Sequence, residues 1–120
     1  MTLERPGEAD LVLVGSAVSA LRRGTGAPWT ASAARTSTGE VVVALGLKDF
    51  VCAEAAVVAG VLARGARVDT LVTVKHLTDD ATKVVPPCPS CRALLQKHAG
   101  SARVLHLSEG LRVSRVGALP

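Results

Sequence analysis

Apolar residues recur at helical spacing in three parts of the chain. The first part begins at Asp10, a residue type that caps helices, and its apolar positions then fall on one helical face. The second follows Cys52 and is apolar nearly all round, which is typical of a buried helix. The third is stopped by Gly100. We therefore expect helices at residues 10–23, 53–63 and 90–98.

Strand-like segments lie between these helices. The run Val41-Val42-Val43 strongly favours β structure, and the Ser37-Thr38-Gly39 segment before it is typical of a hairpin turn. Residues 78–87 are expected to form a loop, and residues 111–116 fit either a fifth strand or a short terminal helix. The expected strands cover residues 30–36, 40–47, 68–77 and 102–107.

The order of these elements predicts an α/β fold. Two strand–helix–strand crossovers imply a mixed β-sheet, of about five strands, packed between helices. The sequence has 120 residues, which is enough for one domain with a substantial core. It shows no internal repeat and no linker, so we expect a single domain over residues 1–120.

The composition narrows the classes of function. The net charge of +4 is modest and the arginines are scattered, so no basic groove is indicated. One Phe, one Trp and no Tyr leave few aromatic faces for stacking exposed bases, so nucleic acid is not an expected partner. No apolar run is long enough to span a membrane, and acidic residues precede the first apolar segment, where a secretion signal has positive charge. We therefore expect a cytoplasmic protein with no membrane partner.

Three cysteines stand at the starts of two predicted helices. Cys52 precedes one helix, and Cys88 and Cys91 form a Cys-x-x-Cys pair at the start of another. An odd number of cysteines does not make a disulfide framework, and the free N–H groups of a helix start favour thiolate. A structural zinc takes four protein ligands, whereas a catalytic zinc takes three and keeps a position for water. The three cysteines are therefore predicted to bind one zinc ion (Zn2+) per chain.

Two charged residues lie beside these cysteines. Glu54 is in the same first turn as Cys52, so it can approach a zinc-bound water and act as its proton shuttle. Taken alone, it is also compatible with a simple negative charge at a helix start, but its occurrence together with Cys52 and the second cysteine pair favours the proton shuttle. Arg92 follows Cys91 and can donate hydrogen bonds to the thiolates, or it can be an ordinary solvated side chain.

The motifs together resemble those of the zinc-dependent cytidine deaminase superfamily. The resemblance rests on Cys-Ala-Glu at residues 52–54 and Pro-Cys-x-x-Cys-Arg at residues 87–92, and with the order of elements it covers roughly residues 10–107. A cysteine as the first ligand is similar to the small tetrameric cytidine deaminases and to blasticidin-S deaminase. The resemblance implies a cytidine deaminase-like fold and a hydrolase that releases ammonia from a cytosine-type nucleoside or base. It also implies a homo-oligomer, a tetramer or a dimer.

The sequence departs from the family pattern in the substrate region. The family's Asn-x-Glu pair, which holds the ribose, has no counterpart in residues 46–51, and Pro89 and Ala93 replace a usual glycine and glutamine. Lys48 and Asp49 are candidates for the missing polar contacts. The expected contacts to the small-molecule substrate are Ala53, Phe50 and Trp29, the last two through their aromatic faces.

Other functions remain open at this point. The shortened 46–51 segment allows another small aminated heterocycle as substrate, such as a nucleoside antibiotic or a free base. The Cys-x-x-Cys pair alone is compatible with a redox pair, and a histidine as fourth ligand would give a zinc-stabilised domain without catalysis. The histidines do not have ligand spacing to a cysteine; they are His76, His98 and His106.

Overall fold

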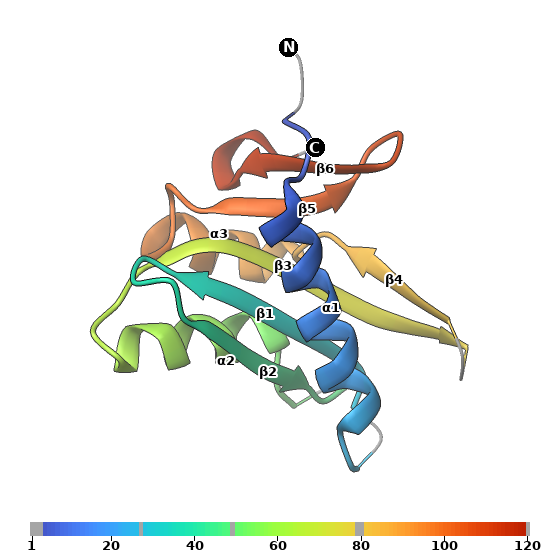
Figure 1. Ribbon diagram of the computed structural model, residues 1–120. Coiled ribbons are helices and arrows are strands. Elements are labelled where there is room, and N and C mark those ends of the chain that lie inside the picture. Colours follow the sequence, from blue (N-terminus) through green and yellow to red (C-terminus); the bar gives the residue numbers. More distant parts are fainter. Residues whose placement is uncertain (1–3, 27, 49, 79–80, 120) are drawn as a thin grey trace.

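A six-stranded sheet forms the centre of the computed structural model, which describes residues 4–26, 28–48, 50–78 and 81–119 (Figure 1). The strands run in the order β2-β1-β3-β5-β6, and β4 pairs with β3 beside this path. The helices are α1 (Glu8–Arg23), α2 (Ala53–Ala63) and α3 (Pro89–His98), and the strands are β1 (Thr30–Thr36), β2 (Val41–Gly46), β3 (Val68–Thr78), β4 (Ala81–Val85), β5 (Arg103–Leu107) and β6 (Leu111–Arg115), followed by the 3-10 turn η1 (Val116–Ala118).

The sheet is mixed, as the order of elements predicted. Strand β1 pairs antiparallel with both β2 and β3, so the α2 connection crosses over β1. Strand β3 pairs parallel with β5 through the α3 connection, and β5 pairs antiparallel with β6. The α/β fold class is therefore confirmed, with six strands where about five were expected.

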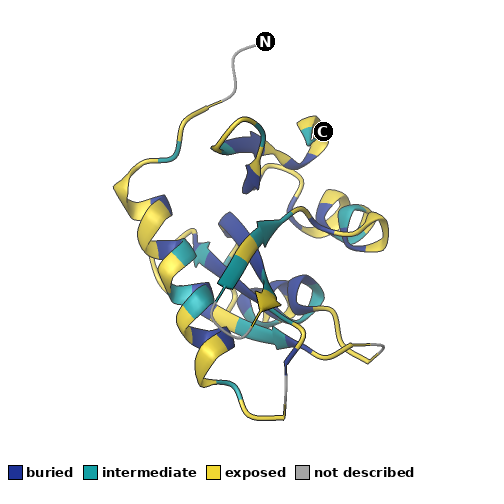
Figure 2. Ribbon diagram, turned by 90° about the vertical axis from the view of Figure 1, so that its right-hand side faces the viewer, coloured by how far each residue is buried: buried dark blue, intermediate teal, exposed yellow. Residues whose placement is uncertain are grey.

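Helices cover the two faces of the sheet, and each face has its own apolar core (Figures 1 and 2). Successive residues of a strand point to opposite faces. On β3, Leu71 accordingly packs with α2 and α3, whereas Val72 packs with α1. Strand β1 contributes alanines to both layers, among them Ala33 and Ala34, and these small side chains let the helices lie close to the sheet.

The start of α1 differs from the expectation. The helix begins at Glu8 with Gly7 as its N-cap, so the prediction that Asp10 caps it is wrong. Asp10 instead lies inside the first turn, where its Oδ2 accepts a hydrogen bond from the Gly7 N–H at 2.9 Å. Its carboxylate is also paired with Arg35 and Arg103, and these long-range partners explain why an aspartate is buried there.

The prediction of a loop at residues 78–87 is also wrong. Strand β3 continues to Thr78, and the β-branched residues of β4 pair back onto it. Residues 79–80 lie outside the described residues. The C-terminal alternatives both occur, because residues 111–115 form β6 and the next three residues form η1. Within the described ranges, no helix combines the length and the apolar character that crossing a membrane requires.

Candidate functional site

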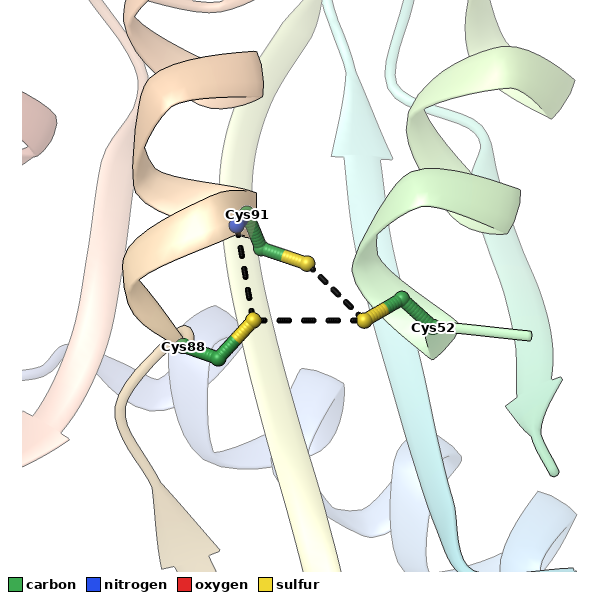
Figure 3. Close-up of side chains that lie close together, drawn as sticks. All are labelled: Cys52, Cys88 and Cys91. Carbon is green, nitrogen blue, oxygen red and sulfur yellow. Dashed lines mark hydrogen bonds between the residues drawn. The ribbon is translucent and has the colours of Figure 1, made fainter. Parts of the chain in front are cut away.

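The three cysteines meet at the adjacent starts of α2 and α3 (Figure 3). Cys52 is the N-cap residue of α2, Cys88 is the N-cap residue of α3, and Cys91 lies in the first turn of α3. The Cys52 Sγ is 4.0 Å from the Cys88 Sγ and 3.1 Å from the Cys91 Sγ. All three sulfurs lie within 4.8 Å of one another and all three thiols are free. The sequence segments that carry them are 36 residues apart, so the fold alone creates the cluster.

The spacing of the sulfurs fits a zinc ion. Tetrahedral zinc binds thiolate at about 2.3 Å, which places two sulfurs of one site about 3.8 Å apart. The measured 3.1 Å and 4.0 Å lie on either side of that value. Two helix N-termini point their free N–H groups towards the cluster and favour negative charge there. The donor set is therefore compatible with zinc held by three protein ligands.

The thiols differ in acidity before a metal binds. A hydrogen bond from Cys91 lowers the pKa of Cys52. Partial burial and the neighbouring Cys88 and Glu54 together raise this pKa by more, so the net shift is upward. Burial raises the pKa of Cys91 strongly, and the neighbouring sulfurs add to this rise. At Cys88 the effect of burial is outweighed by hydrogen bonds from the Cys91 N–H and the other thiols, and its pKa is lowered. Metal binding must then displace protons from Cys52 and Cys91.

Glu54 lies in the first turn of α2, two residues after Cys52. Its side chain is only 6 % exposed, although it lines the pocket described below. Burial raises the pKa of Glu54, while its own backbone N–H and the Thr73 side chain act in the opposite direction. Thr73 is itself fixed by a buried hydroxyl–hydroxyl hydrogen bond to Ser32 at 2.6 Å. Thr73 thus influences the carboxylate from the β1–β3 pair.

A cavity of about 620 Å³ opens at the cysteines. Cys52, Cys88 and Glu54 line it, so the candidate metal centre and the carboxylate face the same space. A volume of this size suits a small-molecule ligand. The remaining lining residues come from β1 and the residue before it, from β3 and β4, and from the loops that follow β2 and β4: Trp29, Thr30, Leu47, Lys48, Phe50, Val51, Thr73, Lys75, Val85 and Pro86.

Two of the three predicted substrate contacts line the cavity and one does not. Trp29 and Phe50 both line the cavity, and the Phe50 side chain is 87 % exposed at its rim. Ala53 is fully buried and does not line the cavity. Asp49 lies outside the described residues.

Arg92 contacts the turn that carries the cysteines. Its Nε donates a hydrogen bond to the Pro87 carbonyl at 3.3 Å, and none of its described hydrogen bonds reaches a sulfur. The side chain therefore acts on the backbone just before Cys88. The predicted contact with the thiolates stays a prediction.

The histidines lie apart from the cysteine cluster. Among the described residues, the cysteines form the one group of three or more side chains close enough to hold a metal. His106 is buried on β5 and hydrogen-bonds the Ser114 hydroxyl at 2.8 Å. Nothing in the described residues adds a histidine as fourth ligand.

Two pocket residues could not be found from the sequence. Thr73 and Lys75 lie on β3, and they enter the pocket because β3 pairs with β1 in the register that sets Ser32 opposite Thr73 and Thr30 opposite Lys75. A strand register between segments 41 residues apart is not visible in a local pattern. No signal in the sequence around these two residues distinguishes them from other strand positions.

Comparison with known proteins identifies the fold. No protein-family model and no curated protein sequence matches the chain. The chain is similar to the crystal structure of the cytidine deaminase from Mycobacterium tuberculosis, with 26 % identity, 93 % of each chain covered and a TM-score of 0.68. It is similar to the cytidine deaminase from Burkholderia pseudomallei at 19 % identity, with 89 % of this chain and 92 % of that chain covered and a TM-score of 0.69. A third match, the cytidine deaminase from Bacillus anthracis, has 14 % identity, covers 82 % of this chain and 76 % of that chain, and has a TM-score of 0.70.

The chain has the cytidine deaminase fold. The resemblance to the cytidine deaminase superfamily that the two cysteine motifs predicted is thereby confirmed. Within this fold, the cysteine cluster and Glu54 sit where α2 and α3 begin, next to the shortened segment between β2 and α2. This segment contributes Leu47, Lys48, Phe50 and Val51 to the wall of the pocket.

Proposed function

We propose that the chain is a zinc-dependent hydrolase that removes an exocyclic amine from a cytosine-type nucleoside or base and releases ammonia. One observation carries the proposal: three sulfurs lie within 4.8 Å of one another, and two of them, those of Cys52 and Cys88, line one cavity of about 620 Å³ together with the buried Glu54. The similarity to solved cytidine deaminases supports the same reaction class.

Cys52, Cys88 and Cys91 would hold the zinc. When bound, zinc would supply a water acidic enough to act as a nucleophile near neutral pH. Three thiolates leave such a complex with a net charge of about −1, which opposes that acidity. The two helix N-termini offset the charge, because both α2 and α3 begin at these cysteines.

Glu54 would move the protons of the reaction. Its carboxylate takes a proton from the attacking water and returns it to the departing amine. One water is consumed, the C–N bond breaks, a C=O bond forms and ammonia leaves, so the atoms balance. The surroundings of Glu54 suit this role because the residue is largely buried and yet lines the cavity.

A second candidate substrate class has its own support. The segment between β2 and α2 forms a tight turn in which Leu47 and Val51 exchange backbone hydrogen bonds of 2.9 and 3.0 Å. This turn carries Lys48 and Phe50 to the rim of the cavity in place of an Asn-x-Glu pair. Another aminated heterocycle, such as a nucleoside antibiotic or a free base, is therefore the alternative substrate. A zinc-stabilised domain without catalysis is less well supported, because structural zinc sites have four protein ligands.

The assembly and surroundings of the chain are proposals of the same kind. Exposed apolar side chains around the pocket, including Leu47, Phe50 and Val51, fit burial against further copies in a homotetramer or a dimer. A single domain over residues 1–120, a cytoplasmic location and the absence of a nucleic-acid partner stay predictions from the sequence.

Ammonia release from a panel of amines tests the proposed function. The zinc-loaded protein is incubated with cytidine, deoxycytidine, cytosine, cytidine 5′-monophosphate, guanine, adenosine and blasticidin S, and ammonia is measured against time. Release from a cytosine-type compound supports the main proposal. Release from another amine alone supports the alternative, and release from none of them, with zinc fully bound, contradicts both.

A further inference from the structure

Two lysines converge on one aromatic ring at the wall of the proposed active site. The Nζ of Lys75 lies 4.7 Å from the centre of the Trp29 ring, and the Nζ of Lys48 lies 5.1 Å from it. The two ammonium groups are therefore no more than about 10 Å apart. All three residues line the cavity that also contains Cys52 and Glu54.

A third lysine adds to this positive charge. Lys83 on β4 lies directly opposite Lys75 on β3, so both side chains leave the same face of the sheet. Like charges in this position destabilise a strand pair. Three of the four lysines of the chain thus gather at this end of the sheet, although the net charge of the whole chain is only +4.

The described residues do not neutralise these charges. Neither Lys48 nor Lys75 forms a salt bridge with any residue in the described ranges. Their contact there is with Trp29, and a cation–π contact at a partly exposed site contributes only about 0.5–1 kcal/mol. Positive charge gathered on one wall of a cleft attracts anionic groups to that wall.

We propose that the substrate carries an anionic group, a phosphate or a carboxylate, which Lys48 and Lys75 bind beside Trp29 while the aminated ring faces Glu54. The proposal rests on the proposed deaminase function and names the substrate class for it. Lysine binds such anions as a mobile point charge. The cavity has two walls of opposite polarity: the lysines on one are positive, and the thiol cluster and Glu54 on the other are negative or acceptor groups. This difference orients the ligand.

Ligand binding tests the proposal separately from turnover. The zinc-loaded Glu54→Gln protein is titrated with cytidine 5′-monophosphate, cytosin-1-ylacetic acid and cytidine at low ionic strength. Trp29 is the only tryptophan of the chain, so its fluorescence reports directly on the lysine site. We expect the phosphate or the carboxylate ligand to bind about tenfold more tightly than cytidine, and added salt to reduce the difference. The tighter of the two anions identifies the chemical group.

Substitutions assign the preference to the lysines. In the same Glu54→Gln background, Lys75→Gln and Lys48→Gln are each expected to reduce the preference for the anionic ligand over cytidine. Lys75→Arg, which keeps the positive charge, should retain that preference. Lys97→Gln is the matched control, because Lys97 is exposed in the last turn of α3 and does not line the cavity. Equal affinities for anionic and neutral ligands, binding of none of them, or a preference that survives both glutamine substitutions would overturn the proposal. Ammonia release by the unsubstituted protein decides the proposed function independently of these results.

Discussion

The Sγ atoms of Cys91 and Cys52 lie 3.1 Å apart, with the Cys91 thiol donating to the Cys52 sulfur across the gap between α3 and α2 (Figure 3). A disulfide has a sulfur–sulfur distance of about 2.05 Å, so this pair is not bonded. The same contact brings the N-termini of two helices together, and Cys88 completes the cluster from the end of the β4–α3 connection.

Zinc content is expected to follow the cysteines. The purified chain should hold one zinc ion, and Cys88→Ala should lose it because two thiolates do not make a closed site of high affinity. Metal analysis of both proteins measures this. Glu54→Gln is the control, since Glu54 is not one of the three sulfur donors and its substitution should leave the zinc content at one. Full zinc occupancy in Cys88→Ala would refute the ligand assignment.

Asp10→Asn is expected to destabilise the chain by about 3 kcal/mol, because it leaves two arginines without their buried partner. Asp10 is 2 % exposed, and its carboxylate oxygens lie 3.1 Å from the Arg35 guanidinium and 2.9 Å from that of Arg103. Urea unfolding at neutral pH measures the loss. Asp69→Asn is the matched control, because Asp69 also contacts Arg35 but is exposed, and it should cost less than about 1 kcal/mol. Equal losses in the two variants would contradict this account.

The same aspartate sets an acid limit on stability. The hydrogen bond from Arg103 is the main cause that holds the pKa of Asp10 well below its usual range. A lowered folded-state pKa gives stability that is fully present above the unfolded-state value of about 3.9 and is lost as the pH falls below it. The free energy of unfolding should therefore drop between pH 5 and pH 2 in the unsubstituted chain and fall less steeply in Asp10→Asn. Parallel curves for the two proteins over this range would be inconsistent with the ion pairs.

Gly46→Ala is expected to disturb the pocket as well as the fold. A Cβ atom at Gly46 would lie 2.2 Å from the Thr30 Oγ1 and 3.0 Å from the Ala53 backbone nitrogen, between Cys52 and Glu54. Since Ala53 is in the rigid start of α2, the clash should lower both the unfolding midpoint and the ammonia-release rate. Gly15→Ala is the control, because its Cβ meets nothing within 4 Å on an exposed face of α1, and it should stabilise by up to about 1 kcal/mol. Unchanged stability and an unchanged ammonia-release rate in Gly46→Ala would show that the structure accommodates a Cβ atom at this position.

The sequence predicted the parts of this structure that depend on local patterns. The second helix was expected at residues 53–63 and is found there, because its apolar run has a cysteine before it and a glycine after it. The cysteine motifs were sufficient to suggest a shared metal, since each stands at a helix start. The two crossover connections of a mixed sheet were enough to predict that the starts of both helices, and with them the cysteines, lie close together.

The parts that were missed depend on contacts between distant segments. Asp10 looked like a helix cap because its partner Arg103 is 93 residues away. Strand β4 was missed because its short run between polar and proline residues is stabilised by pairing with β3 and shows no helical or strand period of its own. Lys75 likewise reaches Trp29 through the β1–β3 register, whereas Lys48 comes to the same ring from the turn after β2.

The most direct test of the central claim compares ammonia release by the unsubstituted chain and by Glu54→Gln, both loaded with zinc. Glutamine keeps the size of the side chain but cannot move a proton, so the fold and the zinc content should be preserved. The rate should fall by at least about a hundredfold, the minimum usual for loss of a general acid–base group. An unchanged rate in Glu54→Gln, on whichever amine the chain consumes, would show that Glu54 is not the proton carrier.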